Sequence, residues 1–244
     1  PGVVTGKPLA TGGSLGRNEA TGRGLLFTLE TWCEKNHKKM DGLTMAVQGF
    51  GNVGSVGSLL IHRQWVKVVW VGDINGTWYN PNGLDIEAMY VYANSHGRSL
   101  KGYTEAGATI IPDMDLFSQD VDVLFMAAME NQLNEKTMEL VKAKLVLEGA
   151  NGPTTEEADI CFEKKGIEVL PDVMSNVGGV VGSYFEWVQN IQELTWERNQ
   201  VNDMLEKLMT QSFAEIQEAV EQYSCTYRMG AYIVALKKLI FAEE

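Results

Sequence analysis

The sequence predicts an α/β fold built on a doubly wound, mainly parallel β-sheet and followed by C-terminal helices. Two observations support this prediction. Short apolar segments of strand length alternate with helical segments from residue 43 to about residue 182, which is typical of a parallel sheet with helical crossovers. Beyond Ser183, apolar residues recur three and four positions apart to the end of the chain, as on amphipathic helices.

The start of the chain differs from the rest. Residues 1–17 are rich in glycine and lack an apolar period, so we expect an extended lead-in there. Asn18 is a candidate N-cap for a helix that continues to about Lys35. A domain normally begins with a strand or helix that closes its own edge, so this opening predicts that a further domain precedes the lead-in.

The later elements follow from turn residues and changes of apolar period. Strands are expected at residues 43–48, 66–73, 77–79, 108–111, 121–126, 144–147 and 167–170. A helical run that includes residues 58–61 follows the first strand, and further helices are expected at about 84–95, 134–143, 155–165 and 228–241. Asn134 is the expected cap of the helix that ends near Ala143. The 244 residues are therefore interpreted as one domain, with a core at 43–182 and C-terminal helices at 183–244.

The segment between the first two strands contains a glycine motif, Gly49-Phe50-Gly51-Asn52-Val53-Gly54, and Asp73 ends the second strand. The first glycine suits a tight turn, the second a close approach of the backbone to a bound group, and the third close packing of the helix start. A Rossmann-like βαβ unit has this order, with a pyrophosphate at the helix N-terminus and a ribose on the acid. The motif predicts dinucleotide binding; an unliganded glycine turn is the alternative.

Composition excludes several classes of function. A formal net charge of −12 argues against nucleic acid or an anionic membrane surface as a partner, because both bind basic patches. The three cysteines are far apart and lack the spacing of a metal site, which indicates buried thiols, no metal and a reducing compartment. The sequence has no long apolar run and no signal-peptide pattern, so a cytoplasmic protein is expected.

Several short motifs are spread along the chain. They are Thr5-Gly6-Lys7-Pro8, Gly12-Gly13-Ser14-Leu15-Gly16-Arg17, Ala20-Thr21-Gly22-Arg23-Gly24, the glycine motif with Gln48, residues 79–83, Glu148-Gly149-Ala150-Asn151-Gly152-Pro153-Thr154-Thr155, Pro171-Asp172, Asn176 with Gly178-Gly179-Val180, and residues 183–190. Together and in this order they resemble the cofactor half of the hexameric glutamate dehydrogenases. The resemblance implies an oxidoreductase that converts L-glutamate to 2-oxoglutarate and ammonia by hydride transfer to a nicotinamide cofactor.

The resemblance also assigns roles to residues. Asn52 and Val53 would give backbone N–H groups to the pyrophosphate, and Asp73 would hold the adenosine ribose. Thr21 and Asn176 would fix the nicotinamide carboxamide, because both side chains donate and accept hydrogen bonds. The other predicted site residues are Arg17 near the carboxamide, Asn151 by the nicotinamide ribose, Ala127 and Ala128 in the loop after a buried strand, and Ser183 at the distal carboxylate of glutamate.

Each of these side chains also has a purely structural explanation. Thr21 could bond back to its own helix, and Asn176 could cap a helix. Arg17 could be a surface charge, Asn151 a turn residue, and Ser183 a small residue that allows close packing. The structure is needed to separate these explanations from the functional ones.

The resemblance has consequences for activity. In this family the catalytic lysine and aspartate belong to an N-terminal substrate domain, and no counterpart of its active-site segment occurs in this sequence. We therefore expect this chain to hold the cofactor without turning over glutamate alone, and to meet its substrate only with that domain. The resemblance also implies a homo-oligomer for the full-length protein.

The residues near Asp73 bear on the choice of cofactor, and Trp65 bears on one turn of the fold. NAD is favoured over NADP, because Asp73 would repel a 2′-phosphate and residues 72–80 contain no Arg or Lys. Trp65 stands at a turn where the family has glycine, so this connection is expected to be rebuilt. The competing interpretations are a scaffold that keeps the fold without binding NAD, and a dehydrogenase of another amino acid.

Overall fold

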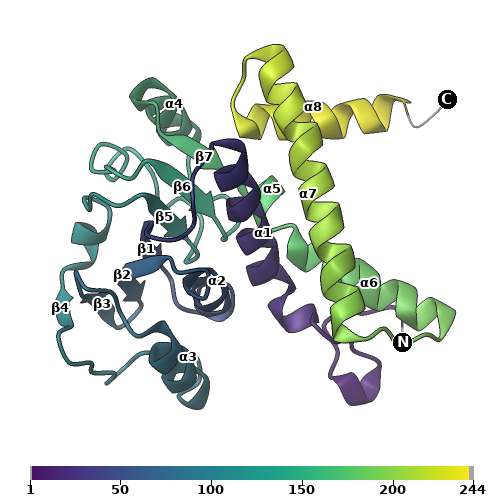
Figure 1. Ribbon diagram of the computed structural model, residues 1–244, viewed down its shortest axis with the longest axis horizontal. Helices are drawn as coiled ribbons and strands as arrows, with labels where there is room; N and C mark the ends of the chain where they lie inside the picture. The colour runs from purple at the N-terminus through teal and green to yellow at the C-terminus, as the bar shows by residue number, and fades with distance from the viewer. Residues whose placement is uncertain (1, 242–244) are drawn as a thin grey trace.

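The computed structural model describes residues 2–241 and confirms the predicted α/β fold. The strands of this part of the chain form one seven-stranded sheet in the order β4-β3-β2-β1-β5-β6-β7 (Figure 1). They are β1 (Thr44–Gln48), β2 (Lys67–Asp73), β3 (Gly76–Tyr79), β4 (Thr109–Ile111), β5 (Val123–Met126), β6 (Leu145–Glu148) and β7 (Glu168–Leu170). Strands β2, β1, β5, β6 and β7 are parallel, and β3 and β4 pair antiparallel at one edge. Residue 1 of the predicted lead-in and residues 242–244 of the predicted C-terminal region lie outside the described residues.

Helices cover both faces of the sheet and form a further layer beside it. They are α1 (Ala20–Lys35), α2 (Asn52–His62), α3 (Ile86–Ser95), α4 (Glu156–Lys165), α5 (Asp172–Ser175), α6 (Gly178–Gln192), α7 (Arg198–Tyr223) and α8 (Tyr227–Ile240), with the short 3₁₀ helices η1 (Leu9–Thr11), η2 (Arg17–Glu19) and η3 (Asp113–Leu116). None of the helices within residues 2–241 is both long enough and apolar enough to cross a bilayer.

The two faces of the sheet have separate apolar cores, because successive residues of a strand point to opposite sides. On one face, Val47 of β1 and Phe125 of β5 pack in the same fully buried cluster as Leu25 of α1. On the other face, Leu124 of β5 packs in the same cluster as Phe162 of α4. The sheet is thus doubly wound, as predicted.

Helix α1 connects the sheet to the C-terminal helices. In Figure 1, α7 runs alongside α1, with α6 near one end of α7 and α8 at the other. The α1–α6 approach is close: a Cβ added to Gly24 of α1 would lie 3.0 Å from the Cα of Gly178 in α6. Phe27, Phe185 and Leu205 fill a third core between α1, α6 and α7. This layer brings the start of α1 next to the start of α6.

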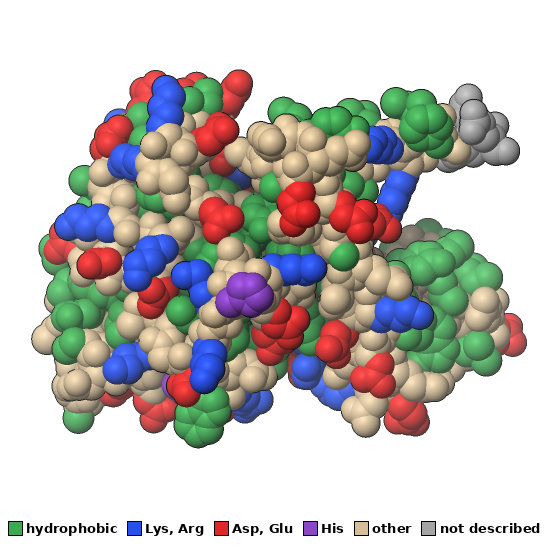
Figure 2. Space-filling model, turned by 45° about the horizontal axis from the view of Figure 1, so that its top comes forward, with side chains coloured by type: hydrophobic (Ala, Val, Ile, Leu, Met, Phe, Trp, Pro, Cys, Tyr) green, Lys and Arg blue, Asp and Glu red, His purple; other side chains and the backbone are tan. Residues whose placement is uncertain are grey.

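The surface reflects the composition. On the face in Figure 2, acidic and basic side chains are interspersed, and hydrophobic side chains gather beside the grey C-terminal atoms. The exposed apolar residues of that end are on and just after α8, and they are Met229, Tyr232, Leu236, Leu239, Ile240 and Phe241. Mixed charges of this kind favour solubility rather than attraction to one polyanion.

Two predicted helix caps are wrong. Asn134 begins a series of turns instead of the predicted helix 134–143: its side chain accepts from the Lys136 N–H two residues on, which makes an Asx turn. The hydroxyl of Thr137 accepts from the Asn134 N–H and donates to the Gln132 carbonyl, which fixes these turns. Asn18 lies inside η2, which leads into α1 without a side-chain cap.

The turn at Trp65 is kept rather than rebuilt, contrary to expectation. Trp65 adopts φ 67°, and its side chain is 78% exposed. Its N–H donates to the carbonyl of His62, so the residue closes the turn between α2 and β2. A bulky residue in the left-handed region is strained, and the indole is too exposed for its burial to offset this strain.

Candidate functional site

The sheet changes its winding direction at β1. From β1 the chain passes to β2 on one side and returns later to β5 on the other side. The loops after β1 and β5 diverge at such a switch point and leave a crevice at the carboxyl ends of the strands. Two cavities adjoin there, one of about 590 Å³ and one of about 410 Å³, and both are lined by Ala127, Ala128 and Met129 of the β5 loop.

The glycine motif closes the middle of this crevice, and its glycines have different reasons to be there. Gly49 has φ 95°, and a Cβ on it would lie 2.6 Å from the backbone of Ala127. A Cβ on Gly54 would collide with the carbonyl oxygen of Gly49. A Cβ on Gly51 would meet nothing within 4 Å. The chain's own packing therefore requires the first and third glycines, whereas the second faces open space.

Helix α2 starts directly behind this open space. Gly51 is its N-cap, and no side chain caps the helix start. The N–H groups of the first turn, at Asn52 and Val53, therefore remain free for an anion at the positive end of the helix dipole. The side chain of Phe50 is 2% exposed and belongs to the core, so that only the backbone of Phe50 can face a ligand.

The smaller cavity extends from the glycine motif to the end of β2. Asp73 lines it, and its carboxylate accepts the N–H groups of Asn75 at 2.6 Å and of Leu100 at 2.8 Å. The side-chain amide of Asn75 also donates to Oδ2 at 3.1 Å, so the lone pair that remains for a ligand hydroxyl is on Oδ1. Gly72 fits tightly here, because a Cβ on it would lie 3.2 Å from the side chain of Leu116.

Arg98 is a basic residue that the sequence argument missed. It follows α3, has φ 64° and lines the same cavity as Asp73. Arg98 lies outside residues 72–80, and only the folded chain brings it to the same cavity as Asp73. A scan for cations in the loop after α3 could have identified it.

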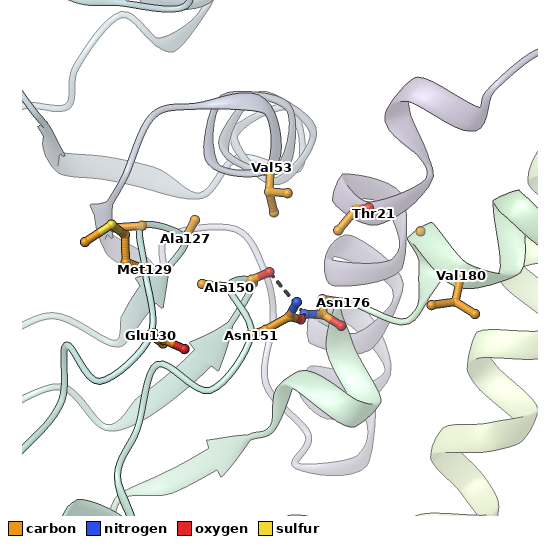
Figure 3. Close-up of a pocket in the computed structure, with 12 residues that line it drawn as sticks. Thr21, Val53, Ala127, Met129, Glu130, Ala150, Asn151, Asn176 and Val180 are labelled. Atoms are coloured by element: carbon orange, nitrogen blue, oxygen red, sulfur yellow. Dashed lines mark hydrogen bonds between the residues drawn. The ribbon is translucent and has the colours of Figure 1, made fainter. Parts of the chain in front are cut away.

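The larger cavity lies on the other side of the β5 loop. Its lining includes Thr21, Val53, Asn151 and Asn176, which come from four different segments of the chain (Figure 3). The side-chain nitrogen of Asn176 donates to Oδ1 of Asn151 at 2.7 Å and to the carbonyl of Gly149 at 3.3 Å. Among residues 2–241 no group pairs with Oδ1 of Asn176, which leaves an amide acceptor at the cavity.

The contacts of Thr21 and Asn176 do not fit the purely structural roles, a bond back to the helix for Thr21 and a helix cap for Asn176. Thr28 and Thr31 bond back to α1 carbonyls, but Thr21 makes no such bond within the described chain. The side chain of Asn176 does not cap α6, because no side-chain cap is present there. Within the described chain, the Thr21 hydroxyl and Oδ1 of Asn176 therefore remain available to a group in the cavity.

Arg17 and Ser183 form a pair of their own. The Nε of Arg17 donates to the hydroxyl of Ser183 at 2.9 Å, and that hydroxyl donates to the carbonyl of Gly179 at 3.1 Å. Neither side chain lines the two cavities. Gly179 lies against Thr21, since a Cβ on it would be 2.5 Å from the Thr21 hydroxyl. The pair, with Ser183 on α6 and Arg17 on η2, therefore lies just beyond the Thr21 end of the larger cavity.

The lead-in is anchored on the same helix by a residue that the sequence did not suggest. Glu186 of α6 is fully buried and accepts from the backbone N–H of Gly6 at 2.9 Å and from the Lys7 ammonium at 2.5 Å. Burial acts to raise the pKa of Glu186, but the hydrogen bonds from Lys7 and Gly6 hold it below its ordinary value. This anchor holds the lead-in that precedes Arg17.

Comparisons with known proteins identify relatives of the whole chain. A glutamate dehydrogenase of Thermotoga maritima is 43% identical over 242 residues, which are 99% of this chain and 58% of that relative. The leucine-bound hetero-hexameric glutamate dehydrogenase of Thermus thermophilus has a TM-score of 0.89 at 33% identity, over 97% of this chain and 55% of its own. The glutamate dehydrogenase of Peptoniphilus asaccharolyticus has a TM-score of 0.83 at 34% identity, over 99% and 56%.

The chain therefore spans little more than half the length of these relatives. The sequence model of one dehydrogenase family matches residues 12–244, nearly all of the chain. On this match and these likenesses, the chain belongs to the Glutamate/Leucine/Phenylalanine/Valine dehydrogenase family.

Proposed function

We propose that this chain is the cofactor-binding part of a glutamate dehydrogenase and binds NAD across the carboxyl ends of β1 and β5. The observation that supports the proposal best is the open space at Gly51, which lies before an uncapped helix start. A pyrophosphate bound there would accept from the N–H groups of Asn52 and Val53. The adenosine would enter the cavity beside Asp73, and the nicotinamide the cavity of Thr21, Asn151 and Asn176.

The residues of the larger cavity would orient the cofactor rather than react. A carboxamide needs both a donor and an acceptor, and the Thr21 hydroxyl and the Asn176 amide offer both. Fixing that group presents one face of the nicotinamide ring to the substrate. When bound, the nicotinamide supplies the hydride acceptor or donor of the reaction.

The substrate side is also a proposal. Ser183, with Arg17 behind it, would bind the distal carboxylate of glutamate, because a hydroxyl beside a guanidinium suits a carboxylate. A general acid and base of tuned pKa are still required for amine oxidation. We propose that they come from the part of the relatives that this chain does not span, so that this chain alone binds cofactor without oxidising glutamate.

Calorimetric titration of the chain with NADH and with NADPH, at equal ionic strength, tests the cofactor. Tighter binding of NADH is expected, because the Asp73 carboxylate accepts ribose hydroxyls and repels a 2′-phosphate. Tighter binding of NADPH would overturn the choice of NAD and would indicate that Arg98 receives the 2′-phosphate. No heat with either nucleotide would leave only a scaffold.

A Gly51→Ala variant tests the place of binding. Its φ of −76° suits alanine and its Cβ touches nothing in the chain, so the fold and melting temperature are expected to stay unchanged. The methyl group would intrude on the pyrophosphate and weaken NADH binding at least about tenfold, about 1.4 kcal/mol. Unchanged affinity would move the binding site away from the glycine motif.

A further inference from the structure

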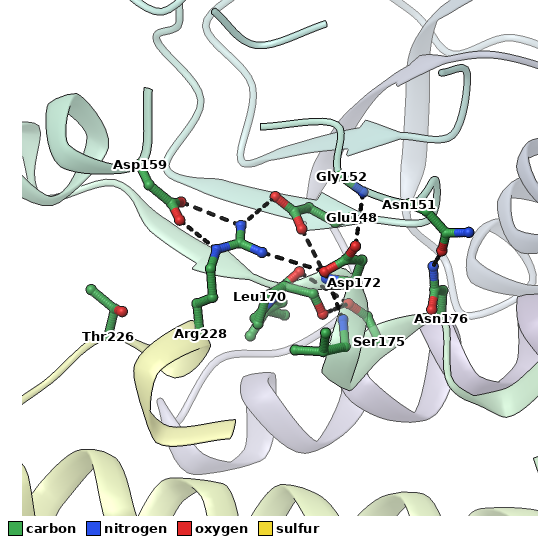
Figure 4. Close-up of polar contacts among 12 residues, drawn as sticks. Glu148, Asn151, Gly152, Asp159, Leu170, Asp172, Ser175, Asn176, Thr226 and Arg228 are labelled. Atoms are coloured by element: carbon green, nitrogen blue, oxygen red, sulfur yellow. Dashed lines mark hydrogen bonds and ion pairs between the residues drawn. The ribbon is translucent and has the colours of Figure 1, made fainter. Parts of the chain in front are cut away.

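Arg228, near the start of α8, contacts three acidic side chains from distant parts of the chain (Figure 4). Its Nη2 donates to Glu148 at 2.7 Å, its Nη1 to Asp172 at 3.3 Å, and its Nε to Asp159. These acids stand at the end of β6, at the start of α5 and in the first turn of α4. One guanidinium therefore ties the last helix to three elements of the Rossmann core.

Two of these carboxylates, Glu148 and Asp172, also accept hydrogen bonds from the backbone beside the larger cavity. The second oxygen of Glu148 accepts from the N–H of Asp172 at 2.8 Å. The Oδ2 of Asp172 accepts from the N–H of Gly152, also at 2.8 Å. Gly152 adjoins Asn151, and Asp172 begins the single turn of α5 that ends next to Asn176. The hydrogen bond between Asn151 and Asn176 then closes a ring of contacts through Asp172, and Arg228 binds this ring at Asp172.

Electrostatics explains why this arrangement needs an arginine. Glu148 is fully buried, and burial raises the pKa of its carboxyl above the ordinary value while Arg228 opposes the rise. A cation in the first turn of a helix is disfavoured by the helix dipole, so α8 alone does not account for Arg228. Its carboxylate partners do, since without it they would repel one another, and Glu148 would be buried without a counter-charge.

We propose that Arg228 is a positioning residue for the nicotinamide half of the site. It holds the loop of Asn151 and the turn before Asn176 at their mutual spacing, and none of the four charged side chains lines the cavity itself. The proposal rests on the proposed function, because it assumes that this cavity receives the nicotinamide. Displacement of either loop would change the binding of that half and leave the adenosine half alone.

Calorimetry of the Arg228→Gln chain with NADH and with ADP provides the test. ADP lacks the nicotinamide riboside and reaches only the helix start and the Asp73 cavity. NADH affinity is expected to fall at least about tenfold, as for other small misplacements of binding groups. ADP affinity is expected to stay within about twofold, because ADP has no nicotinamide riboside to contact Asn151 or Asn176. A merely structural role would not change the ratio of the two affinities.

Two further variants keep the test decisive. Tyr227→Phe is the matched control: it removes a hydrogen bond of 2.7 Å from α8 to Gln217 of α7 and leaves the adjacent Arg228 in place. It should leave both affinities unchanged. Arg228→Lys keeps the charge but cannot reach three carboxylates at once, so its NADH affinity should be intermediate. This variant replaces Arg228→Gln if the glutamine chain does not fold.

The outcomes separate the two proposals. Unchanged NADH affinity in a folded Arg228→Gln chain, or an equal loss for NADH and ADP, would overturn the positioning role while the proposed function stands. A wild-type chain that binds neither nucleotide would overturn the proposed function, and the positioning role with it.

Discussion

The two halves of the crevice are built in different ways. The half near Asp73 is organised around one continuous segment, in which β1, the glycine motif, α2 and β2 follow one another between residues 44 and 73, and the β5 loop and Arg98 contribute to its lining. The other half collects Thr21, Asn151 and Asn176 from α1, the β6 loop and the end of α5. Backbone sterics shape the first half, whereas a network of side-chain hydrogen bonds shapes the second. The first should therefore resist loss of distant contacts better than the second.

Gly49→Ala should have the largest effect and would show how strictly backbone sterics govern the first half. Its φ of 95° and the contact at 2.6 Å with Ala127 leave no room for a methyl group. A loss of about 3 kcal/mol in the free energy of unfolding is expected, together with loss of ADP binding. Urea denaturation measures the first and calorimetry the second. Wild-type stability would contradict a sterically fixed turn.

Asn176→Ala should have a large effect on the second half only. The change removes the bonds to Asn151 and Gly149, so NADH binding is expected to weaken at least about tenfold while ADP binding is retained. Asn36→Ala is the matched control, because Asn36 bonds a carbonyl of α1 away from the crevice. Equal loss of NADH and ADP binding would end the distinction between the halves.

Trp65→Gly should change stability without changing either half. Glycine relieves the left-handed backbone, and little buried area is lost from a side chain that is 78% exposed. The free energy of unfolding is expected to rise by about 1 kcal/mol. The NADH and ADP affinities should equal those of the wild type. A lower melting temperature would mean that the tryptophan makes a stabilising contact.

Glu30→Gln should produce a small, pH-dependent effect at the helix layer behind the second half. Burial, then Glu206 and Glu34, raise the pKa of Glu30 to about 7 in α1. Its protonated form is favoured in the folded state, so stability falls as the pH rises from about 4.5 through 7. After allowance for solvent screening this is about 1 kcal/mol, or about 2–4 °C in melting temperature.

Melting curves of both proteins at pH 5 and pH 8 measure that effect. The wild type should lose more of its melting temperature across this range than Glu30→Gln does. Equal slopes would place the pH dependence elsewhere in the chain.

Much of the fold was predictable because local patterns specify it. Apolar periodicity predicted the strands found in residues 2–241, and the helix expected at 155–165 is α4, which ends at Gly166. The wrong predictions concern residues that can form either of two local structures. At Asn134 the side chain closes an Asx turn where a helix cap was predicted, and the polar contacts of Thr137 stabilise that turn. Pattern reasoning weighs such alternatives poorly because both use the same residues.

The sequence by itself determined the sheet, its winding and the glycine turn after β1, because strand and helix periods and glycine sterics act between near neighbours. Only the tertiary structure decided which distant side chains meet. Arg228 reaches Glu148 across 80 residues, and Arg17 reaches Ser183 across 166. Such pairs leave no periodic signal, since a hydrogen bond between distant segments depends on how the chain folds back and not on the residues that flank each partner.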